Sequence, residues 1–402
     1  MRPIYLDNNA TTRTDPAVVA AMLPFFSEQF GNASSAHAFG SEVAGAVKQA
    51  RKNLQALLGA AFDHEIVFTS GGTESDNAAI LSALDTQSRR DEIVTTAVEH
   101  PAILSLVEHL AASRGIKVHF VGVDARGRLD IEAYRRALGP RTAIASVMSA
   151  NNETGTLFPV AQLAAIAHDA GALFHTDAVQ AVGKIPLDLK ATGIDMLSLS
   201  GHKLHGPKGI GALYLRKGTK FSSFIRGGPQ ERRRRGGTEN VPGIVGLGKA
   251  AELALSHMEQ EQTRVRALRD RLERGILQFG HCCVLGDVDN RIPNTSNIAF
   301  EHLEGEAIIH HLNKAGIAAS LGSACASGSM EPSHVLRAMN VPLTVLRGAI
   351  RFSLSRDNTI DDVVRVLSLL PDILAKLKGL SPSWQERAHV AANSSRSTEL
   401  TP

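Results

Sequence analysis

The sequence predicts an α/β fold built on a mainly parallel sheet, together with a second, smaller domain. Between about residues 60 and 215, short β-rich segments alternate with helical patterns, which is the order expected of βαβ units. A smaller βα pattern follows the segment PNTSNIAF. The chain has 402 residues, whereas single hydrophobic cores stop growing near ~250 to 300 residues, so we expect two domains.

The expected elements follow one another as short strands, most of them followed by a helix or a turn. A long, mostly amphipathic helix is expected over about residues 243 to 275. The segment TIDDVVRVLSLLPDILAKL predicts a last helix, because Thr359 is a suitable N-cap and Asp361 and Asp362 place negative charge in the first turn. The strand segments are HEIVFTS, EIVTTAV, AIASVMSA, ALFHTDA, DMLSLS and IGALYLR, and the helices after the first three are ESDNAAILSAL, AILSLVEHLAAS and VAQLAAIAHDAG.

Composition excludes several classes of protein. A content of 43% hydrophobic and 21% charged residues is typical of a globular domain, and a net charge of +3 is too small for a general polyanion binder. No apolar run approaches the ~20 residues needed to span a bilayer, and the first residues, MRPIYLDNNATTRTD, lack the apolar region of a signal peptide. The odd count of three cysteines cannot form a closed disulfide framework. We therefore expect a reduced, cytoplasmic protein that binds neither membrane nor nucleic acid.

Polar and glycine-rich segments directly follow the predicted strands. They are GGTE, EH, NNETG, DAVQ and GHKLHGPKG. Because ligands of open α/β sheets bind outside the carboxyl ends of the strands, these five segments are expected to face one crevice.

Lys203 directly follows the strand DMLSLS. A lysine at that point could form a Schiff base with an aldehyde cofactor, although a loop lysine is more often simply solvated. Asp177, at the end of another strand, could keep the ring nitrogen of such a cofactor protonated, or could cap a helix. Gly71, Gly72 and Thr73 stand at a helix start that could bind a phosphate, and His100 could stack on a ring or be structural.

Cys325 lies in SLGSACASGS, among small and polar residues. A cysteine without a disulfide is usually a small buried hydrophobe. At the tip of a flexible loop, however, a thiol could move toward a substrate sulfur and away again.

The motifs taken together resemble the pyridoxal-phosphate-dependent cysteine desulfurases of the NifS/IscS type, within the class V aminotransferase family. The resemblance runs in order from about residue 4 to 380. It rests on LDNNATT, FTSGGTESDN, EHPA, NNETG, HTDAVQ, GHKLHGPKG, RRGGTEN, GSACASG and IRFSLSR.

The resemblance implies a role for each matching residue. Cys325, Lys203 and His100 would be catalytic, with Lys203 carrying the Schiff base. Cys325 is also a possible transient iron–sulfur ligand, and no resident metal is expected. The cofactor pyridoxal 5'-phosphate would be held by Gly72, Thr73, His100, Asn152, Asp177, Gln180, Ser200, His202, Lys203 and, from a second subunit, Thr238. The substrate L-cysteine would be held by Arg351, Asn152, Asn8, Ala10 and Thr11.

The implied fold is fold type I, with a seven-stranded sheet in a large cofactor-binding domain (15–257). A small α+β domain (1–14 and 258–380) would carry the Cys325 loop, and a polar tail (385–402) would follow. The implied enzyme is a homodimer that converts L-cysteine to L-alanine and an enzyme-bound persulfide. Its sulfur would pass to an iron–sulfur scaffold protein of the NifU-like or IscU-like kind. AMLPFFSEQFGNASS, AILSAL and SPSW resemble the nitrogen-fixation branch more than the housekeeping one.

Some features depart from the family or leave alternatives open. The family often has His at Pro229 and Thr or Ser at Ala326, and the cluster Arg232 to Arg235 invites a nucleic-acid interpretation that lacks aromatic partners. A selenocysteine lyase or a class V aminotransferase remains an alternative within the fold. A noncatalytic sulfur carrier or scaffold, which needs Cys325 but not Lys203, is the alternative from another class.

Overall fold

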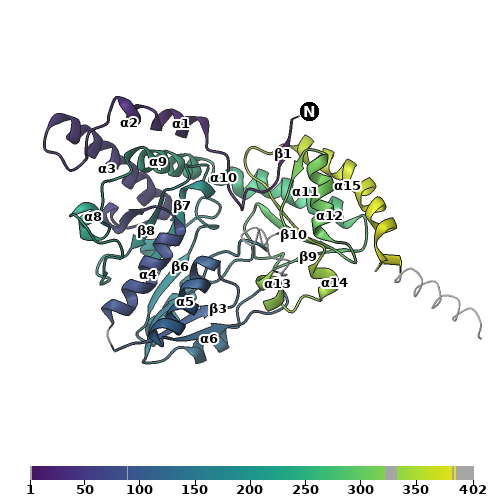
Figure 1. Ribbon diagram of the computed structural model, residues 1–402, viewed down its shortest axis with the longest axis horizontal. Coiled ribbons are helices and arrows are strands. Elements are labelled where there is room, and N and C mark those ends of the chain that lie inside the picture. Colours follow the sequence, from purple (N-terminus) through teal and green to yellow (C-terminus); the bar gives the residue numbers. More distant parts are fainter. Residues whose placement is uncertain (1, 88, 322–332, 383, 386–402) are drawn as a thin grey trace, which may run out of the picture.

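The computed structural model describes residues 2–87, 89–321, 333–382 and 384–385. A large α/β part and a smaller α+β part lie side by side (Figure 1). Within the described residues, no helix has both the length and the apolar character needed to cross a membrane.

The large part contains a seven-stranded sheet with the order β2-β8-β7-β6-β5-β3-β4. β8 is antiparallel to both of its neighbours, and the other pairings are parallel. This sheet confirms the predicted α/β fold. The analysis of the sequence did not single out β4, an edge strand with a partly exposed surface. The strands are β2 (Ile66–Thr69), β3 (Glu92–Thr96), β4 (Lys117–Val121), β5 (Thr142–Ser146), β6 (Leu173–Asp177), β7 (Met196–Ser200) and β8 (Gly211–Leu215).

Neighbouring residues on the central strands pack into different hydrophobic cores, because side chains alternate between the two faces of a sheet. Phe68 and Val94 belong to one core, and Val67 and Ile93 belong to the other. Since both faces are covered, these strands read as nearly continuous apolar runs. The first core includes residues of α3 (Ala38–Leu58), α7 (Val160–Asp169) and α9 (Val241–Ser256), and the second includes residues of α4 (Gly72–Thr86) and α5 (Pro101–Arg114).

Shorter helices complete the large part. Asp15 caps α1 by accepting a hydrogen bond from the Ala17 N–H, and Asp130 caps α6 in the same way through Ala133. Such caps satisfy donors that a helix start leaves unpaired. These helices are α1 (Pro16–Met22), α2 (Pro24–Ser27), α6 (Ile131–Ala137) and α8 (Gln230–Arg233), with the 3-10 turns η1 (Asp63–Glu65), η2 (Leu189–Ala191) and η3 (Gly201–Lys203).

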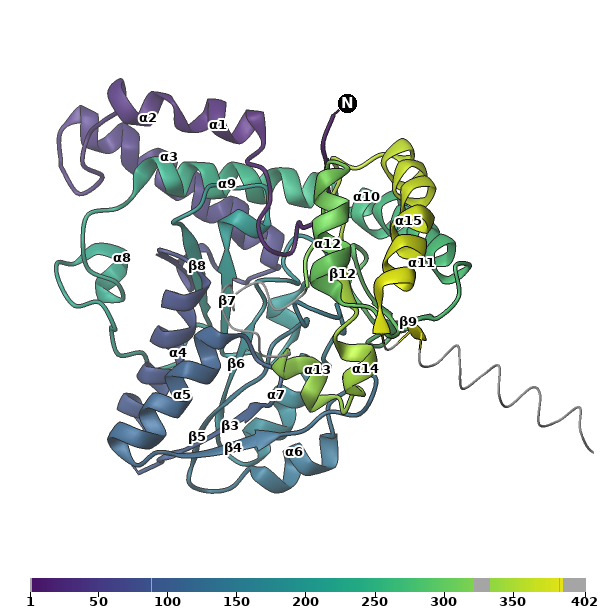
Figure 2. The same cartoon turned by 45° about the vertical axis from the view of Figure 1, so that its right-hand side comes forward.

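The smaller part has its own core around a three-stranded antiparallel sheet with the order β12-β10-β9. The capping box that Thr359 forms with Asp362 starts α15, as the sequence predicts. Figure 2 shows α11, α12 and α15 gathered beside this sheet. The elements are β9 (Cys282–Leu285), β10 (Thr295–Phe300), β12 (Ala349–Ser353), the parallel pair β1 (Ile4–Tyr5) and β11 (Ile317–Ala318), and the helices α11 (Arg266–Leu277), α12 (Gly305–Lys314), α13 (His334–Ala338), α14 (Leu343–Leu346) and α15 (Ile360–Leu380).

The long helix expected over 243 to 275 is interrupted. After α9, the chain passes through α10 (Met258–Gln260) and a π-helical turn, η4 (Glu261–Val265), before α11 begins. His257 ends α9 with a non-helical backbone, and its ring Nδ1 lies 2.7 Å from the Leu253 carbonyl oxygen. The uninterrupted helix was therefore a wrong expectation, because apolar periodicity does not report such a local break.

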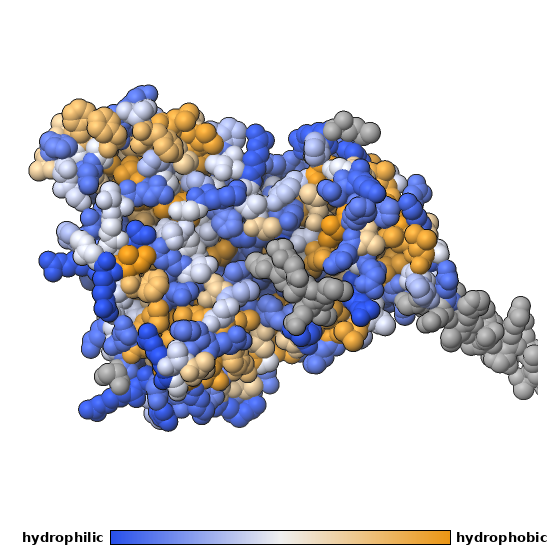
Figure 3. All heavy atoms as spheres, in the orientation of Figure 1, coloured by the Kyte–Doolittle hydropathy of each residue, from blue (hydrophilic) through white to orange (hydrophobic). Residues whose placement is uncertain are grey.

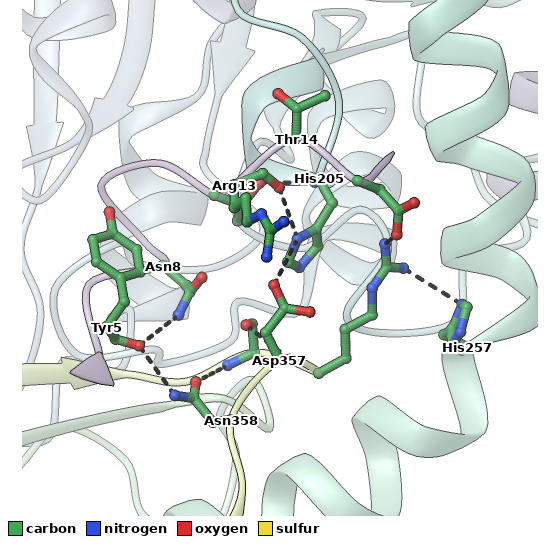
Figure 4. Close-up of polar contacts among 12 residues, drawn as sticks. Tyr5, Asn8, Arg13, Thr14, His205, His257, Asp357 and Asn358 are labelled. Carbon is green, nitrogen blue, oxygen red and sulfur yellow. Dashed lines mark hydrogen bonds and ion pairs between the residues drawn. The ribbon is translucent and has the colours of Figure 1, made fainter. Parts of the chain in front are cut away.

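Arg356 of the smaller part forms contacts with the large part near the end of α9. Its guanidinium donates to Asp15 Oδ2 at 2.6 Å and lies 3.4 Å from His257 Nδ1. In the same region, His205 Nδ1 lies 3.1 Å from the Arg13 carbonyl oxygen (Figure 4). These contacts lie close to the two predicted domain boundaries, which fall between residues 14 and 15 and between residues 257 and 258. The boundaries themselves stay a prediction.

Candidate active site

The carboxyl ends of the parallel strands face one cavity of about 270 Å³. Asp177 ends β6 and Ser200 ends β7, so both side chains are placed by strands of the rigid sheet. This is the edge at which open α/β sheets bind ligands. The predicted site residues that line the cavity are Ala10, Gly72, Thr73, His100, Asn152, Asp177, Gln180, Ser200, His202, Lys203 and Arg351.

Lys203 projects from η3, the turn that directly follows β7. Its Nζ atom donates hydrogen bonds to the carbonyl oxygens of Asn9 and, at 2.7 Å, of Ala10. The segment LDNNATT therefore holds the lysine amine at the cavity, although almost two hundred residues separate the two in sequence.

Asp177 is almost fully buried, and its Oδ1 accepts a hydrogen bond from the Val179 N–H at 2.9 Å. Burial raises the pKa of Asp177, whereas the hydrogen bond from the Val179 N–H and the charge of Lys203 act to lower that pKa. A positively charged group placed in this cavity would lower the pKa further. The site therefore favours a ligand that brings a protonated nitrogen to Asp177.

His100 is the N-cap of α5, where its Nδ1 accepts the Ala102 N–H at 3.1 Å. Burial lowers the pKa of His100. The charge of Asp177 acts against this shift, and the charge of Lys203 adds to it. The neutral ring, with Nδ1 as an acceptor, carries its proton on Nε2. The helix start thus fixes both the position and the tautomer of this imidazole.

The N-terminus of α4 forms an anion cradle on the cavity wall. Gly72 begins this helix, and a Cβ atom on Gly72 would lie 2.8 Å from Val179 Cγ2, so only glycine allows this close approach. Ser200, Thr73 and His202 line the same cavity. Unpaired N–H groups and the helix dipole at such a start favour a phosphate.

Arg351 reaches the cavity from β12 of the smaller part and is 1% exposed. Its guanidinium donates to the Asn152 carbonyl oxygen at 3.0 Å and to Asp7 Oδ1 at 2.8 Å. A buried guanidinium held in this way is suited to bind a carboxylate.

The N-terminal segment contributes differently from what was expected. Asn9, which the sequence analysis passed over, lines the cavity beside Ala10. Asn8 and Thr11, both predicted to bind substrate, do not line it. The Asn8 amide donates to the Ser353 carbonyl oxygen at 3.0 Å, and Thr11 Oγ1 lies 3.1 Å from His202 Nδ1. In the folded loop these side chains contact other groups, including the cavity residue His202, and no periodicity in LDNNATT reports that arrangement.

A buried carboxyl, Asp76, was also missed. It lines the cavity from α4, one turn past the helix start, and its Oδ1 lies 3.6 Å from His175 Nε2. Burial, and then the charge of Asp177, raises the pKa of Asp76 well above its usual range. Burial also lowers the pKa of His175 to about 3, so this ring stays neutral. The only signal in the sequence was an aspartate on an apolar helix face.

Thr238 lies apart from the other predicted cofactor ligands. It lines a second cavity, of about 260 Å³, together with Arg235 and Glu239. Nearby, Glu231, Arg232 and Arg233 all have positive φ angles, and Glu231 pairs with Arg51 at 2.6 Å. Arg235 pairs with Glu74 of α4 at 3.0 Å. At least part of the Arg232 to Arg235 cluster is therefore bound within the protein.

Cys325 and Ala326 lie outside the described residues. The described residues on either side of segment 322–332 contact the cavity wall or its neighbours. Ser320 pairs with the Arg351 main chain at 2.7 Å, and His334 Nε2 lies 2.9 Å from the Glu99 carbonyl oxygen.

Cys282 and Cys283 lie on β9, away from the cavity lining. Both are half-buried, and Cys282 Sγ contacts the Ile276 carbonyl oxygen at 3.3 Å. Burial raises the pKa of both thiols, so neither is activated as a nucleophile.

A lysine amine, a buried carboxyl, an imidazole and an anion cradle thus surround one cavity at the end of a parallel sheet. This combination defines a fold type I transferase site, because it matches the needs of an aldehyde cofactor that also carries a ring nitrogen and an anionic group.

The chain belongs to the aminotransferase class V family, whose profile matches residues 4–366. It is 70% identical over 389 residues to a cysteine desulfurase of Gluconacetobacter diazotrophicus, covering 96% of this chain and 97% of that one. It is 61% identical over 385 residues to the cysteine desulfurase NifS of Azotobacter vinelandii, covering 96% of each. A solved NifS-like protein superposes with a TM-score of 0.87 at 38% identity, covering 93% of this chain and all of that one. The family expected from the motifs is confirmed.

Proposed function

We propose that this protein is a pyridoxal-phosphate-dependent cysteine desulfurase. The reaction joins L-cysteine and the Cys325 thiol to give L-alanine and a Cys325 persulfide. The Cβ–Sγ bond of the substrate breaks, and a bond forms between its sulfur and the sulfur of Cys325. The observation that carries the proposal is Lys203, whose amine is held at the cavity that Asp177, His100 and the α4 cradle share. The relatives named cysteine desulfurase support it.

The described residues would hold pyridoxal phosphate through three of its groups. Lys203 would take the aldehyde, Asp177 the ring nitrogen, and the start of α4 with Ser200 and His202 the phosphate. When bound, the cofactor supplies an electron sink for the pair left at Cα after a proton departs. His100 lies where a flat ring could stack, and burial keeps that imidazole neutral.

The remaining residues bind the substrate and move protons. Arg351 binds the substrate carboxylate, and its own guanidinium stays fixed by Asp7. The Lys203 Nζ atom takes the Cα proton, since it lies on the cavity wall and is tethered by two carbonyl oxygens. Nε2 of His100 is the second proton-carrying group at the cavity. Because Nε2 already carries a proton, it can donate a hydrogen bond to the thiolate form of Cys325, whose own proton is released to solvent.

Cys325 is proposed as the sulfur acceptor because of its position between two anchored residues. Ser320 is paired with the main chain of the substrate-binding Arg351, and Ser333 Oγ donates to the buried Glu153 at 2.6 Å. In the sequence, Cys325 stands between these two anchored residues, four positions after Leu321.

The sulfur would then pass to an iron–sulfur scaffold protein of the NifU-like or IscU-like kind. The relative named NifS supports the nitrogen-fixation branch of this function. The Cys325 thiol must stay reduced to act as a nucleophile, so we place the reaction in the cytoplasm.

We further propose that the enzyme is a homodimer. An apolar surface of Leu23, Phe26, Phe30 and Phe39, each 58% exposed or more, covers part of α1 to α3 (Figure 3). Exposed apolar patches mark protein contacts. Thr238 lies outside the cavity of its own chain, which supports a role in the site of a second copy.

The deciding experiment is to incubate the purified protein with L-cysteine, pyridoxal phosphate and a thiol, and to measure alanine and sulfide. Equal yields of both products support the desulfurase. Preference for L-selenocysteine in kcat/KM would identify a selenocysteine lyase, and amino-group transfer to a keto acid would identify an aminotransferase. A protein that stays colourless with added cofactor and accepts sulfur only from another enzyme would be a carrier or scaffold.

A further inference from the structure

A second buried lysine lies directly behind the cavity. Lys184 is 6% exposed and follows Gly183, whose positive φ of 76° turns the chain. A Cβ atom on Gly183 would lie 2.6 Å from Leu204 Cδ2, so this turn packs tightly against the residue after Lys203. Lys184 does not line the main cavity and has no role in the reaction described above.

The Lys184 side chain is one end of a short chain of hydrogen bonds that reaches Lys203. Its Nζ atom donates to the Gln180 carbonyl oxygen at 3.2 Å and to Gln180 Oε1 at 3.0 Å. The Gln180 Nε2 atom in turn donates to the Asn9 carbonyl oxygen at 3.0 Å. The same Asn9 oxygen accepts a hydrogen bond from Lys203 Nζ.

This arrangement fixes which way the Gln180 amide faces. An ammonium is a donor only, so it requires Oε1 on its own side and leaves Nε2 toward Asn9. Without that donor, the amide could turn over and present its oxygen to the Asn9 carbonyl, where two acceptors would repel each other. The Lys203 amine, which shares that carbonyl, would then shift from the position that Asn9 and Ala10 set together.

Lys184 and Lys203 also line a third, much smaller cavity of about 20 Å³, large enough for about one water molecule. Glu261 of η4 lines this cavity as well, and the neighbouring Gln262 donates to the Lys184 carbonyl oxygen. Lys203 is therefore on the wall of both cavities, with Lys184 on the side away from the main one.

Burial of the Lys184 amine lowers the free energy of unfolding. Burial, and then the charge of Lys203, lowers the pKa of Lys184 to about 7. Between that value and its ordinary pKa of 10.5, the unfolded chain binds more protons than the folded one. The free energy of unfolding therefore rises with pH across this window, and at neutral pH the buried lysine lowers it. A residue kept for packing alone would be replaced by an apolar side chain without this cost.

We propose that Lys184 is a positioning residue of the active site. Its amine sets the orientation of the Gln180 amide and, through the Asn9 carbonyl, the position of the Lys203 amine that receives the aldehyde cofactor. This inference rests on the proposed cofactor function.

The test compares Lys184→Met, which removes the donor, with Lys184→Arg, which keeps one. The full-length protein is freed of cofactor, and its dissociation constant for pyridoxal phosphate and its thermal midpoint without cofactor are measured. Lys184→Met is expected to raise the dissociation constant about tenfold, the equivalent of one hydrogen bond to a charged group, without lowering the midpoint. Lys184→Arg should recover most of the affinity. Lys190→Met, on the exposed η2 turn, is the matched control and should match the wild type.

A Lys184→Met variant with unchanged affinity would overturn the inference, as would one whose lost affinity only follows a lowered thermal midpoint. If Lys184→Met does not fold, Lys184→Gln, whose shorter side chain cannot reach Gln180 in the same way, is measured alone and together with Gln180→Ala. When Lys184 acts through Gln180, Lys184→Gln weakens cofactor binding alone but adds no further loss once the Gln180 amide is absent, whereas an independent loss contradicts the proposal. Failure of the wild-type protein to bind pyridoxal phosphate would instead refute the proposed function.

Discussion

The Nζ atom of Lys203 lies 2.7 Å from the carbonyl oxygen of Ala10. This contact joins the turn after β7 to the segment that follows β1 on its way to the large part. The lysine is thus oriented by main-chain atoms, which a side-chain substitution in LDNNATT would not remove directly.

Replacing Lys203 by Ala should abolish turnover while leaving cofactor affinity partly intact. The remaining ligands at α4, Asp177 and Ser200 are untouched, whereas both covalent attachment and a general base are lost, so turnover should fall by at least about 10². Borohydride reduction followed by mass spectrometry should find no cofactor on the variant. Lys208→Ala, five residues further on and exposed, is the control; trapping of cofactor on another lysine would contradict the assignment.

Asp177→Asn should weaken cofactor binding more than Asp76→Asn. Burial and the charge of Asp177 raise the pKa of Asp76 well above its usual range, which favours its neutral form, so we expect a neutral amide to be tolerated better there. Asp177 loses an anion, and its variant should bind pyridoxal phosphate about tenfold more weakly or worse. Fluorescence titration measures both constants, with Asp85→Asn on the exposed end of α4 as control. Equal losses for Asp76 and Asp177 would show that the two carboxyls do not differ in charge.

Glu99→Gln should reduce the loss of stability as the pH rises. Burial raises the pKa of Glu99 from 4.5 to about 8. The folded protein therefore holds a proton that the unfolded chain releases between these values, and stability falls across that window by up to about 1.4 kcal/mol per pH unit. In the Glu99→Gln variant, the thermal midpoint of the cofactor-free enzyme should fall less between pH 5 and pH 8. Parallel curves for variant and wild type would mean that Glu99 is not buried in its neutral form.

Cys325→Ser should bind cofactor and L-cysteine but release no sulfide, because a hydroxyl is a poor nucleophile toward sulfur. Replacing Cys282 and Cys283 together by Ala should leave most of the activity, since both thiols lie on β9 outside the cavity. Mass spectrometry after a pulse of L-cysteine should find the added sulfur on the peptide that contains Cys325. Added sulfur on the peptide that contains Cys282 and Cys283 would refute this role.

Mixing inactive Lys203→Ala subunits with Thr238→Asp subunits should restore activity if Thr238 completes the site of a second copy. One site of each mixed dimer would then carry both native residues, while the carboxylate in the other would repel the cofactor phosphate. Subunit exchange is verified with two affinity tags before activity is measured. Exchange without recovery would count against a shared site.

The local pattern of the sequence was sufficient for the elements and for much of the site. Apolar runs such as IVFT in β2 predict strands, because both faces of the sheet are covered. Thr359 and Asp362 define a helix start through a cap that depends only on neighbouring residues. The motifs that contain Asp177 and Lys203 stand at or just after the ends of strands. They could be assigned to one crevice because the carboxyl ends of parallel strands lie at the same edge of a sheet.

Only the tertiary structure decided which neighbouring side chains face that crevice. Asn9 lines it while Asn8 and Thr11 do not, and Asp76 and Lys184 become buried beside it. These outcomes depend on contacts between residues far apart in sequence, such as Asn9 with Lys203 and Arg351 with Asp7. Periodicity records the geometry of a single element, whereas the orientation of a loop and the burial of a charge are set by what packs against them.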